Sequence, residues 1–403
     1  MTDTHLTITV FILLLLIASA VAMITKWVPV PYTLALVIVG LITSQLKFLP
    51  AVHISPDLIL LIFLPALLFE ASWNLDLARL RENLVPILWL AFAGVLVSVG
   101  IVGSVLHYAA GLDWPTAMLF GAIISATDPI SVLALFRKLG APERLAVIIE
   151  GESLFNDGTA VVVFRIISGI AVGVTATTSY SKTALAAIGM FFLSCLGGLI
   201  IGAVVGFVAS KITTYFDDHL LEITLTTISA YGSFILAETV GVSPVIAVVI
   251  AGIVIGNYGR RKSMSANTQI AVDSFWEYAA FVVNSLVFLL IGLEIPLGLL
   301  TEHVNVIFWA VLVMLLARAI SLYGLLQISN QVSKPISGKW QHVLFWGGLR
   351  GSLSIAMVLS LPLTLPGRVQ LIAMTFGAVT FSLLIQGLTV SPLLHLLRIE
   401  KNN

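Results

Sequence analysis

Long apolar runs recur along the chain, separated by short polar connections. A helix of about 20 residues crosses the hydrocarbon core of a bilayer, so runs of this length predict membrane spans. The pattern predicts thirteen helices, at about 6–24, 32–46, 57–73, 85–107, 114–136, 145–172, 183–211, 220–240, 243–257, 275–295, 304–328, 341–362 and 369–397. The first run has no Lys or Arg before it and is long enough for a full span, so we interpret it as a helix rather than a signal peptide.

The distribution of Lys and Arg predicts the orientation of these helices in the membrane. With the N-terminus placed outside, the inner loops carry fourteen of the 20 Lys and Arg residues, which are Lys26, Arg79, Arg81, Arg137, Lys138, Arg144, Lys211, Arg260, Arg261, Lys262, Lys334, Lys339, Arg398 and Lys401. The outer loops carry three, which are Lys47, Lys182 and Arg368. Because cytoplasmic loops are enriched in Lys and Arg, this asymmetry predicts thirteen helices with the N-terminus outside and the C-terminus in the cytoplasm.

Composition narrows the class of protein. Of the 403 residues, 59% are hydrophobic and 10% are charged, and the mean hydropathy is +1.08. Soluble domains are about 45–50% apolar and about 25% charged, so a soluble globular protein is excluded. The 20 basic and 20 acidic residues balance, which leaves no basic surface for a nucleic acid partner. We expect a polytopic membrane protein in which residues 1–403 form a single transmembrane unit.

The odd number of predicted helices suggests an internal repeat. Helices 1–6 and 8–13 would form two six-helix repeats of opposite topology, joined by helix 7. The third helix of each half carries a short similar segment, Ile-Phe-Leu before Glu70 and Val-Phe-Leu before Glu294. The fifth helix of each half is interrupted by polar residues, at 127–129 and 347–352. The expected fold class is therefore an all-α polytopic membrane protein with two inverted repeats and discontinuous helices 5 and 12.

Seven carboxylates and three arginines are predicted to lie inside the membrane. The carboxylates are Glu70, Asp128, Glu150, Glu152, Asp157, Glu238 and Glu294, and the buried cations are expected to be Arg165, Arg318 and Arg350. An ionised group near the middle of a bilayer is unfavourable by a few kcal/mol or more, so each needs a partner, a water-lined cavity or a proton. Glu238 and Glu294 lie near the ends of spans, where we interpret them as interfacial.

The densest polar cluster spans 150–158 in the sixth predicted helix. Asn156 and Asp157 follow Ser153 by three and four residues, so the oxygens of the three side chains are expected to share one helical face. Their oxygens suit a hard cation such as sodium or lithium. The alternative is a Ser/Asn helix-packing face with one acid directed into a wet crevice. An Asp beside an Asn in mid-span is costly, which favours the cation site. Glu152 lies off this face and needs another partner.

Thr127, Asp128 and Pro129 interrupt the fifth predicted helix. Proline lacks a backbone donor and disfavours the helical conformation of the residue before it, so the helix should open near Asp128. Irregular backbone persists within a membrane only where it is buried in protein or lines a cavity. Asp128 can accept hydrogen bonds from the freed amides, and Thr127 can offer an oxygen to an ion. The alternative is a simple proline kink.

Three further charged residues complete the candidate site. Glu70 is either a third oxygen ligand or an interfacial acid at a helix end. Arg350, between Gly348 and Gly351, is expected to be the counter-ion of an acid such as Glu152, forming a structural lock. Arg318 could serve in the same way, or could adjust the electrostatic field at Asp157.

The motifs at 127–129, 152–158 and 347–351 together resemble those of the sodium/proton antiporter family, which includes the NhaP-type antiporters and the animal sodium/proton exchangers. The resemblance covers essentially the whole chain. It implies that Asp157 carries the ion and the proton, and that sodium is held by Asp157, Asp128, Ser153, Thr127 and Glu70, with Asn156 beside Asp157. It implies that Glu152 and Arg350 form a stabilising ion pair, with Arg318 on helix 11.

The resemblance also has implications for assembly. It implies a homodimer in a cell membrane, with no cofactor beyond the transported ions. The dimerisation domain would comprise helices 1–3 and 7–10 (about 6–73 and 183–295). The mobile core would comprise helices 4–6 and 11–13 (about 85–172 and 304–397).

The leading functional hypothesis is exchange of sodium, or lithium, for protons. Burial disfavours the charged form of Asp157, so that one carboxylate can hold a proton or a cation but not both. Asn156 supplies an amide rather than a second acid, which predicts one cation per proton. Two alternatives are a cation uniporter or channel, and an intramembrane aspartyl protease using Asp128 and Asp157. No Gly-x-Gly-Asp motif supports the protease.

Overall fold

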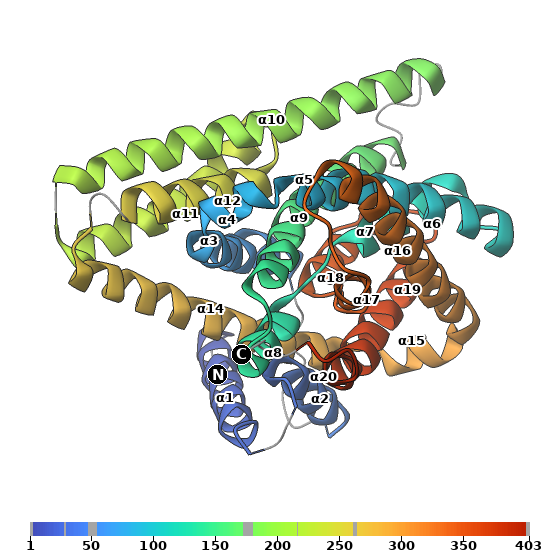
Figure 1. Cartoon of the computed structure of the whole chain (residues 1–403). Helices are drawn as coiled ribbons and strands as arrows, with labels where there is room; N and C mark the ends of the chain where they lie inside the picture. The colour runs from blue at the N-terminus through green and yellow to red at the C-terminus, as the bar shows by residue number, and fades with distance from the viewer. Residues whose placement is uncertain are drawn as a thin grey trace.

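The computed structural model describes residues 3–27, 30–46, 55–171, 180–215, 217–260 and 264–399, and every regular element in these ranges is helical (Figure 1). The elements are α1 (Asp3–Ile24), α2 (Tyr32–Gln45), η1 (Leu58–Phe63), α3 (Leu64–Asn74), α4 (Leu77–Glu82), α5 (Leu84–Leu88), η2 (Trp89–Ala93), α6 (Gly94–Ala110), α7 (Trp114–Ser125), α8 (Ile130–Leu139), α9 (Glu143–Ala171), α10 (Tyr180–Ile212), η3 (Thr213–Tyr215), α11 (His219–Val240), α12 (Pro244–Val254), η4 (Ile255–Gly259), α14 (Ala266–Glu294), α15 (Leu297–Glu302), α16 (Val304–Val332), α17 (Gly338–Trp346), α18 (Ser352–Leu359), α19 (Arg368–Phe381), η5 (Ser382–Gln386) and α20 (Gly387–Leu396). Of the loop residues that orient the array, Lys47, Arg261, Lys262 and Lys401 lie outside the described ranges.

The apolar runs of the sequence correspond to these helices. Within the described residues, eight helices are long and apolar enough to cross a membrane, which are Leu84–Ala110, Trp114–Leu139, Glu143–Ala171, Leu185–Tyr215, His219–Val240, Ala266–Glu294, Val304–Val332 and Arg368–Leu396. Four shorter apolar helices span Ile8–Ile24, Tyr32–Gln45, Leu58–Asn74 and Pro244–Gly259. The remaining predicted run falls on the pair α17 and α18. The all-helical membrane class is confirmed, and the number of crossings stays a prediction.

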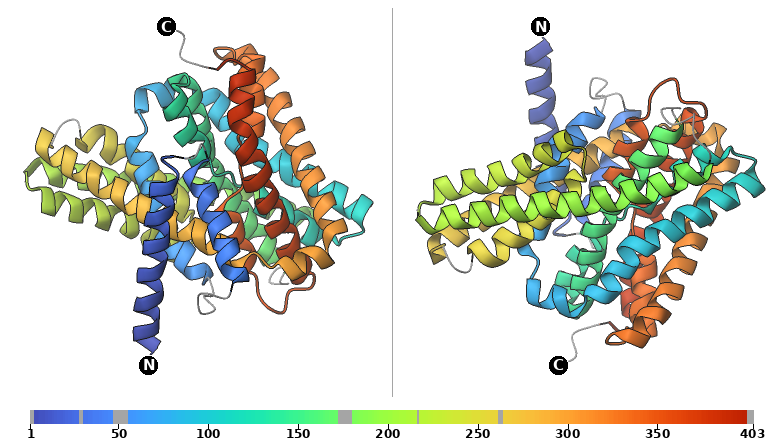
Figure 2. Two further views of the ribbon diagram at one scale, coloured as in Figure 1. Left: turned by 90° about the horizontal axis from the view of Figure 1, so that it is seen from below. Right: turned by 90° about the horizontal axis from the view of Figure 1, so that it is seen from above.

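The helices pack in two groups. In one group, α12 packs against α3, α10 and α11, and α14 packs against α2. In the other, α6 packs against α7 and α16, and α19 packs against α16 and α18. Figures 1 and 2 show α10, α11, α12 and α14 together at one side and α16 to α20 at the other, while α1 projects from the body. Helix α9 contacts members of both groups, including α7, α10 and α12.

Glycine allows a close helix contact between α2 and α14. A Cβ added to Gly40 of α2 would lie 2.3 Å from the carbonyl oxygen of Leu289 in α14, and one added to Gly292 would lie 2.2 Å from that of Val37. Within a membrane, small residues stabilise helix pairs by letting the backbones approach. The two glycines therefore allow the backbones of α2 and α14 to pack closely.

Four of the helical rods contain a π-helical segment, at η1, η2, η4 and η5. Such segments contain one extra residue per turn and often accompany functional sites. The hydrophobic pattern did not predict them, because an apolar run looks the same whether or not its backbone makes this wider turn.

Candidate functional site

The first interruption separates α7 from α8. Helix α7 ends at Ser125 and α8 begins at Ile130, as the proline motif predicts. The Asp128 carboxylate accepts a hydrogen bond from the Ile130 amide, with a distance of 3.1 Å between Oδ1 and N. A negative side chain is favourable at the positive end of a helix, so Asp128 stabilises the start of α8.

The second interruption, between α17 and α18, crosses the first. The Asp128 amide donates to the Leu349 carbonyl oxygen at 2.8 Å. A Cβ added to Gly351 would lie only 2.3 Å from Asp128 Oδ2. Gly351 is therefore needed for the close approach of the two interruptions. Residues 347–351 form one of the two segments that cross. The expectation of discontinuous helices 5 and 12 is confirmed.

Arg350 lies at this crossing, buried to 4% exposure. Its Nη1 donates to the carbonyl oxygens of Ser125 at 2.9 Å and Ala126 at 3.0 Å. Its backbone amide donates to the Ser382 hydroxyl. The last carbonyls of a helix are unsatisfied and carry partial negative charge, so Arg350 neutralises the end of α7.

Glu152 pairs with Arg318 of α16, which corrects the expected pair with Arg350. Arg318 donates from Nη1 to Oε1 at 2.6 Å and from Nη2 to Oε2 at 3.0 Å, and both side chains are buried. Arg318 Nη2 also donates to the Leu344 carbonyl. Gly348 provides room, since a Cβ there would lie 3.0 Å from Arg318 Nε. Because Arg350 is engaged with the end of α7, Arg318 is the partner, as the sequence alternative allowed.

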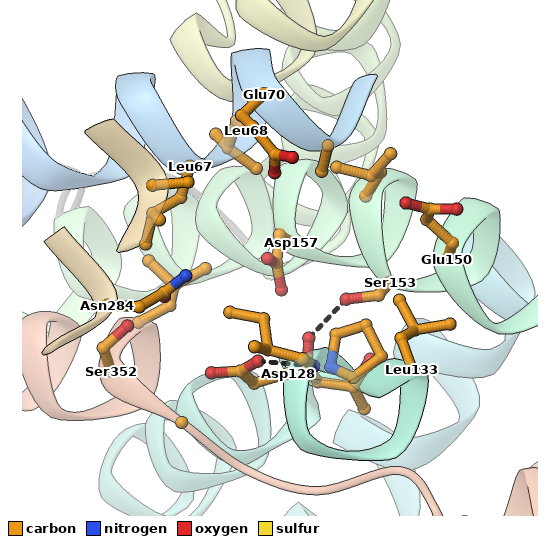
Figure 3. Close-up of a pocket in the computed structure, with 18 of the residues that line it drawn as sticks. Leu67, Leu68, Glu70, Asp128, Leu133, Glu150, Ser153, Asp157, Asn284 and Ser352 are labelled. Carbon is orange, nitrogen blue, oxygen red and sulfur yellow. Dashed lines mark hydrogen bonds between the residues drawn. The ribbon is translucent and has the colours of Figure 1, made fainter. Parts of the chain in front are cut away.

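Five of the six predicted cation ligands line one cavity of about 260 Å³ (Figure 3). They are Asp157, Asp128, Ser153, Thr127 and Glu70. In Figure 3 the Asp157 carboxylate lies between Glu70 above and Asp128 below, and Ser153 is beside it. The fold thus brings predicted ligands from α3, α9 and the α7–α8 interruption together at one cavity.

Asn156 is the exception among these residues. It does not line the cavity, and its amide nitrogen donates to the Ser125 carbonyl at 3.0 Å and to Thr127 Oγ1 at 3.2 Å. Asn156 thus contacts the same α7–α8 interruption as Ser153, which donates to the Thr127 carbonyl, but it does not line the cavity. A spacing of three residues along a helix leaves an angular offset, and the unsatisfied carbonyls of the α7 end attract the amide.

The oxygen atoms at the cavity are incompletely satisfied. Ser153 donates to the Thr127 carbonyl at 2.5 Å. Asp157 Oδ1 is buried and has no hydrogen-bond partner among the described residues. A buried carboxylate oxygen without a hydrogen-bond partner is unfavourable, and a proton or a cation would satisfy it. Asp157 is thus a group at which a positive charge would be stabilising.

The donor set suits an alkali cation as a substrate. Within the described ranges, no group of three or more His, Cys, Asp or Glu side chains is placed to hold a metal ion together. A cation in the cavity would therefore combine carboxylate with hydroxyl, carbonyl and water oxygens, which hard ions prefer. The individual ligands remain a prediction.

Other polar residues of the cavity were not assigned a role from the sequence. Arg137, Glu150 and Glu277 line it, and Arg137 is close enough to act electrostatically on both Glu70 and Glu150. Asn284 and Ser352 line it as well. Asn284 is an amide in the apolar part of its predicted span, and this is the signal in the sequence that marks it.

Arg165 is not a buried cation as expected. Its side chain is exposed, and Nη2 donates to Glu238 Oε1 at 3.0 Å. Both residues lie near helix ends, where a long side chain can reach a polar boundary. The interfacial interpretation of Glu238 agrees with this position.

We expect Gly351→Ala to destabilise the crossing. Its Cβ would lie 2.3 Å from Asp128 Oδ2 and 2.6 Å from Asp128 Cβ, so the two interruptions must separate. Overpacking of this kind lowers the free energy of unfolding by about 1–3 kcal/mol. The midpoint of thermal unfolding in detergent should fall, whereas Gly100→Ala, with no neighbour within 4 Å of the new Cβ, should leave it unchanged or raised. Equal midpoints for the two variants would contradict the close approach.

Comparisons with known proteins agree with this geometry. Residues 11–396 match the model of the family described as sodium/hydrogen exchanger, transmembrane. The chain is 48% identical to the Na⁺/H⁺ antiporter ApNhaP of Aphanothece halophytica, over 91% of this chain and 69% of that protein. It is 46% identical to the low-affinity Na⁺/H⁺ antiporter NhaS1 of Synechocystis, over 94% of this chain and 72% of the relative. The fold resembles the sodium proton antiporter MjNhaP1 of Methanocaldococcus jannaschii, with a TM-score of 0.80, 21% identity and coverage of 98% of this chain and 100% of the other. The resemblance drawn from the motifs is confirmed, and the chain belongs to the sodium/hydrogen exchanger family.

Proposed function

We propose that the protein is a secondary antiporter, not an enzyme, which exchanges sodium or lithium ions for protons across a membrane. The observation that carries this proposal is the buried, unpartnered Oδ1 of Asp157 in a cavity beside two crossing helix interruptions. Relatives named as Na⁺/H⁺ antiporters at 43–48% identity support the choice of ions.

Competition at Asp157 couples the two ions. A buried carboxylate is stabilised by a proton or by a cation, and one occupant excludes the other. Asp128, Ser153, Thr127 and Glu70 provide further oxygens for the cation on the same cavity wall. Exchange then needs no contact between the two substrates, because each leaves before the other binds.

Alternating access requires movement of the helices that hold Asp157. Helix α9 packs against α7 in one group and against α12 in the other, so it lies at the joint between them. In the proposed cycle, the core of about 85–172 and 304–397 moves against a dimerisation domain of about 6–73 and 183–295. Movement is unfavourable while the buried carboxylate is empty and charged, and it proceeds with a proton or a cation bound.

The cavity defines the side from which this conformation is loaded. Its lining includes Asp157 and Asp128 and extends to Arg137, in the last turn of α8. The distribution of Lys and Arg assigns that end of α8 to the cytoplasm. We therefore assign this conformation as open inward. From the family resemblance and the distribution of Lys and Arg, we further propose a homodimer in the plasma membrane with its N-terminus outside.

The transport cycle should move no net charge. The residue before Asp157 is Asn156, an amide held by Ser125 and Thr127, so only Asp157 of this pair titrates. In proteoliposomes containing a pH-sensitive dye, adding sodium or lithium outside should alkalinise the lumen, because each cation that enters is exchanged for a proton that leaves. An imposed potassium–valinomycin voltage of either sign should leave the rate unchanged.

Two results would contradict parts of this proposal. Acceleration of exchange by voltage of one sign would contradict the one-to-one exchange, while leaving antiport intact. Sodium uptake without any proton movement, with protein-free vesicles as the control, would favour a uniporter or channel.

A further inference from the structure

Helix α14 contributes one side chain to the cavity whose hydrogen-bonding capacity is unused. Asn284 lies in an otherwise apolar stretch of this helix and lines the cavity together with Asp157 and Asp128. Its Oδ1 is buried and has no hydrogen-bond partner among the described residues. In Figure 3 the amide nitrogen of Asn284 is directed into the cavity, and Ser352 lies next to it. The amide is thus turned toward the space where an ion or water would bind.

An unpaired amide inside a membrane protein requires a reason. Leaving such a group without a partner is unfavourable by about 1–3 kcal/mol, and an apolar residue of the same size would avoid this. The neighbouring Ser285 shows how α14 normally satisfies its polar residues. Its hydroxyl bonds the Tyr32 hydroxyl at 2.7 Å, on a side of the helix that does not line the cavity.

The amide can present either end to the cavity. Rotation by 180° about the last side-chain bond exchanges its oxygen and nitrogen with almost no change of shape. With the oxygen inward, Asn284 offers the type of ligand that hard cations accept. With the nitrogen inward, it offers a donor to a water molecule or to an empty carboxylate.

Asn284 approaches the cavity from the same helix group as Glu70 of α3. Asp157 is on α9 and Asp128 on the α7–α8 interruption, whereas Asn284 is on α14, which packs against α2 in the other helix group. Residues 284 and 352 meet where α14 contacts α18. A cation at Asp157 that also bound Asn284 would have ligands from both groups.

We propose that Asn284 is a ligand of the transported cation, direct or through one water, and that it contributes to cation affinity and selectivity in the inward-open conformation. This inference rests on the proposed sodium/proton exchange. Because the ligand comes from the opposite helix group, it is available while the cavity has this shape and is lost when the groups move apart. Asn284 therefore contributes to the cation affinity on one side of the membrane.

The test compares Asn284→Leu, which keeps the size of the side chain and removes its polarity, with Asn284→Ser, which keeps an oxygen. In proteoliposomes, Asn284→Leu should raise the apparent KM for sodium by about tenfold and leave the maximal rate within about twofold, because one polar contact to a cation is lost. Asn284→Ser should raise the KM less. The ratio of KM values for lithium and sodium should change in both variants. Ser285→Ala, one residue along the same helix, should change neither quantity.

A second readout does not depend on transport. In sodium-free detergent, Asn284→Leu should unfold at the same temperature as the unmodified protein or higher, because an unpaired polar group has been removed. Added sodium should raise the unfolding midpoint of the unmodified protein and of Ser285→Ala, and the rise should be smaller in Asn284→Leu.

The outcomes separate this inference from the proposed function. If the unmodified protein exchanges sodium for protons, and Asn284→Leu and Asn284→Ser both keep its KM and its sodium-dependent rise in midpoint, the ligand role of Asn284 is wrong. If Asn284→Leu does not fold, the same comparison is made with Asn284→Ser alone, and an unchanged KM overturns the inference. If the unmodified protein neither exchanges nor is stabilised by sodium, both the proposed function and this inference fail.

Discussion

Replacing Asp157 with asparagine should abolish sodium-driven proton flux in proteoliposomes, down to the leak of vesicles without protein. The substitution keeps the shape of the side chain but removes the group that can alternate between a proton and a cation. Asp157 Oδ1 has no hydrogen-bond partner among the described residues. No group bonded to this atom is therefore available to carry the proton or the cation in its place. Losing a charged ligand at the cavity lowers the affinity for a cation on the order of a hundredfold or more.

The control for this prediction is a carboxylate outside the site. Asp57 is exposed and precedes η1, so Asp57→Asn should retain the flux of the unmodified protein. In sodium-free detergent, Asp157→Asn should be at least as stable as the unmodified protein, because a buried charge without a partner has been removed. Added sodium should no longer raise its unfolding temperature. Sodium-dependent proton flux that persists in a folded Asp157→Asn protein would exclude this residue as the carrier.

The sequence predicted the helices and the main features of the site for identifiable reasons. Apolar runs in a membrane protein have one stable backbone solution, the helix, so their positions follow from composition alone. The interruption at Asp128 followed from the backbone chemistry of Pro129, and the one near Arg350 from flanking glycines. Asp157, Ser153 and Glu70 were identified because polar oxygens in the middle of a membrane span are energetically unfavourable unless they line a cavity.

Other features depended on three-dimensional contacts that no local pattern encodes. Two buried arginines were available to Glu152, and the choice of Arg318 depends on the space at Gly348 and on the engagement of Arg350 with the end of α7. The direction of the Asn156 amide depends on the same unsatisfied carbonyls. Asn284 was overlooked because a neutral amide carries no charge penalty, although its lack of a partner is evident once the helices are packed.

Breaking the buried Glu152–Arg318 ion pair is the second change for which we expect a large effect, here on the stability of the protein. Glu152→Leu should strongly destabilise the protein, because it leaves the Arg318 guanidinium buried without its carboxylate. Breaking a buried ion pair from one side lowers the free energy of unfolding by about 3–5 kcal/mol, whereas replacing both partners by apolar residues is often neutral. The double variant Glu152→Leu/Arg318→Met should therefore recover most of the lost thermal stability in detergent.

Two comparisons make this prediction specific to the pairing. Arg79 and Glu143 form an exposed ion pair with side chains 49% and 74% accessible, so Glu143→Gln should change stability by at most about 1 kcal/mol. The double variant Glu152→Leu/Arg350→Met should be no more stable than Glu152→Leu, because Arg350 would be removed from the α7 carbonyls while Arg318 stayed unpaired. If stability returned with Arg350→Met but not with Arg318→Met, the partner of Glu152 in the folded protein would be Arg350. If both double variants recovered, the carboxylate would exchange partners during the movement of the helices, which would make the pair part of the transport cycle rather than a fixed lock.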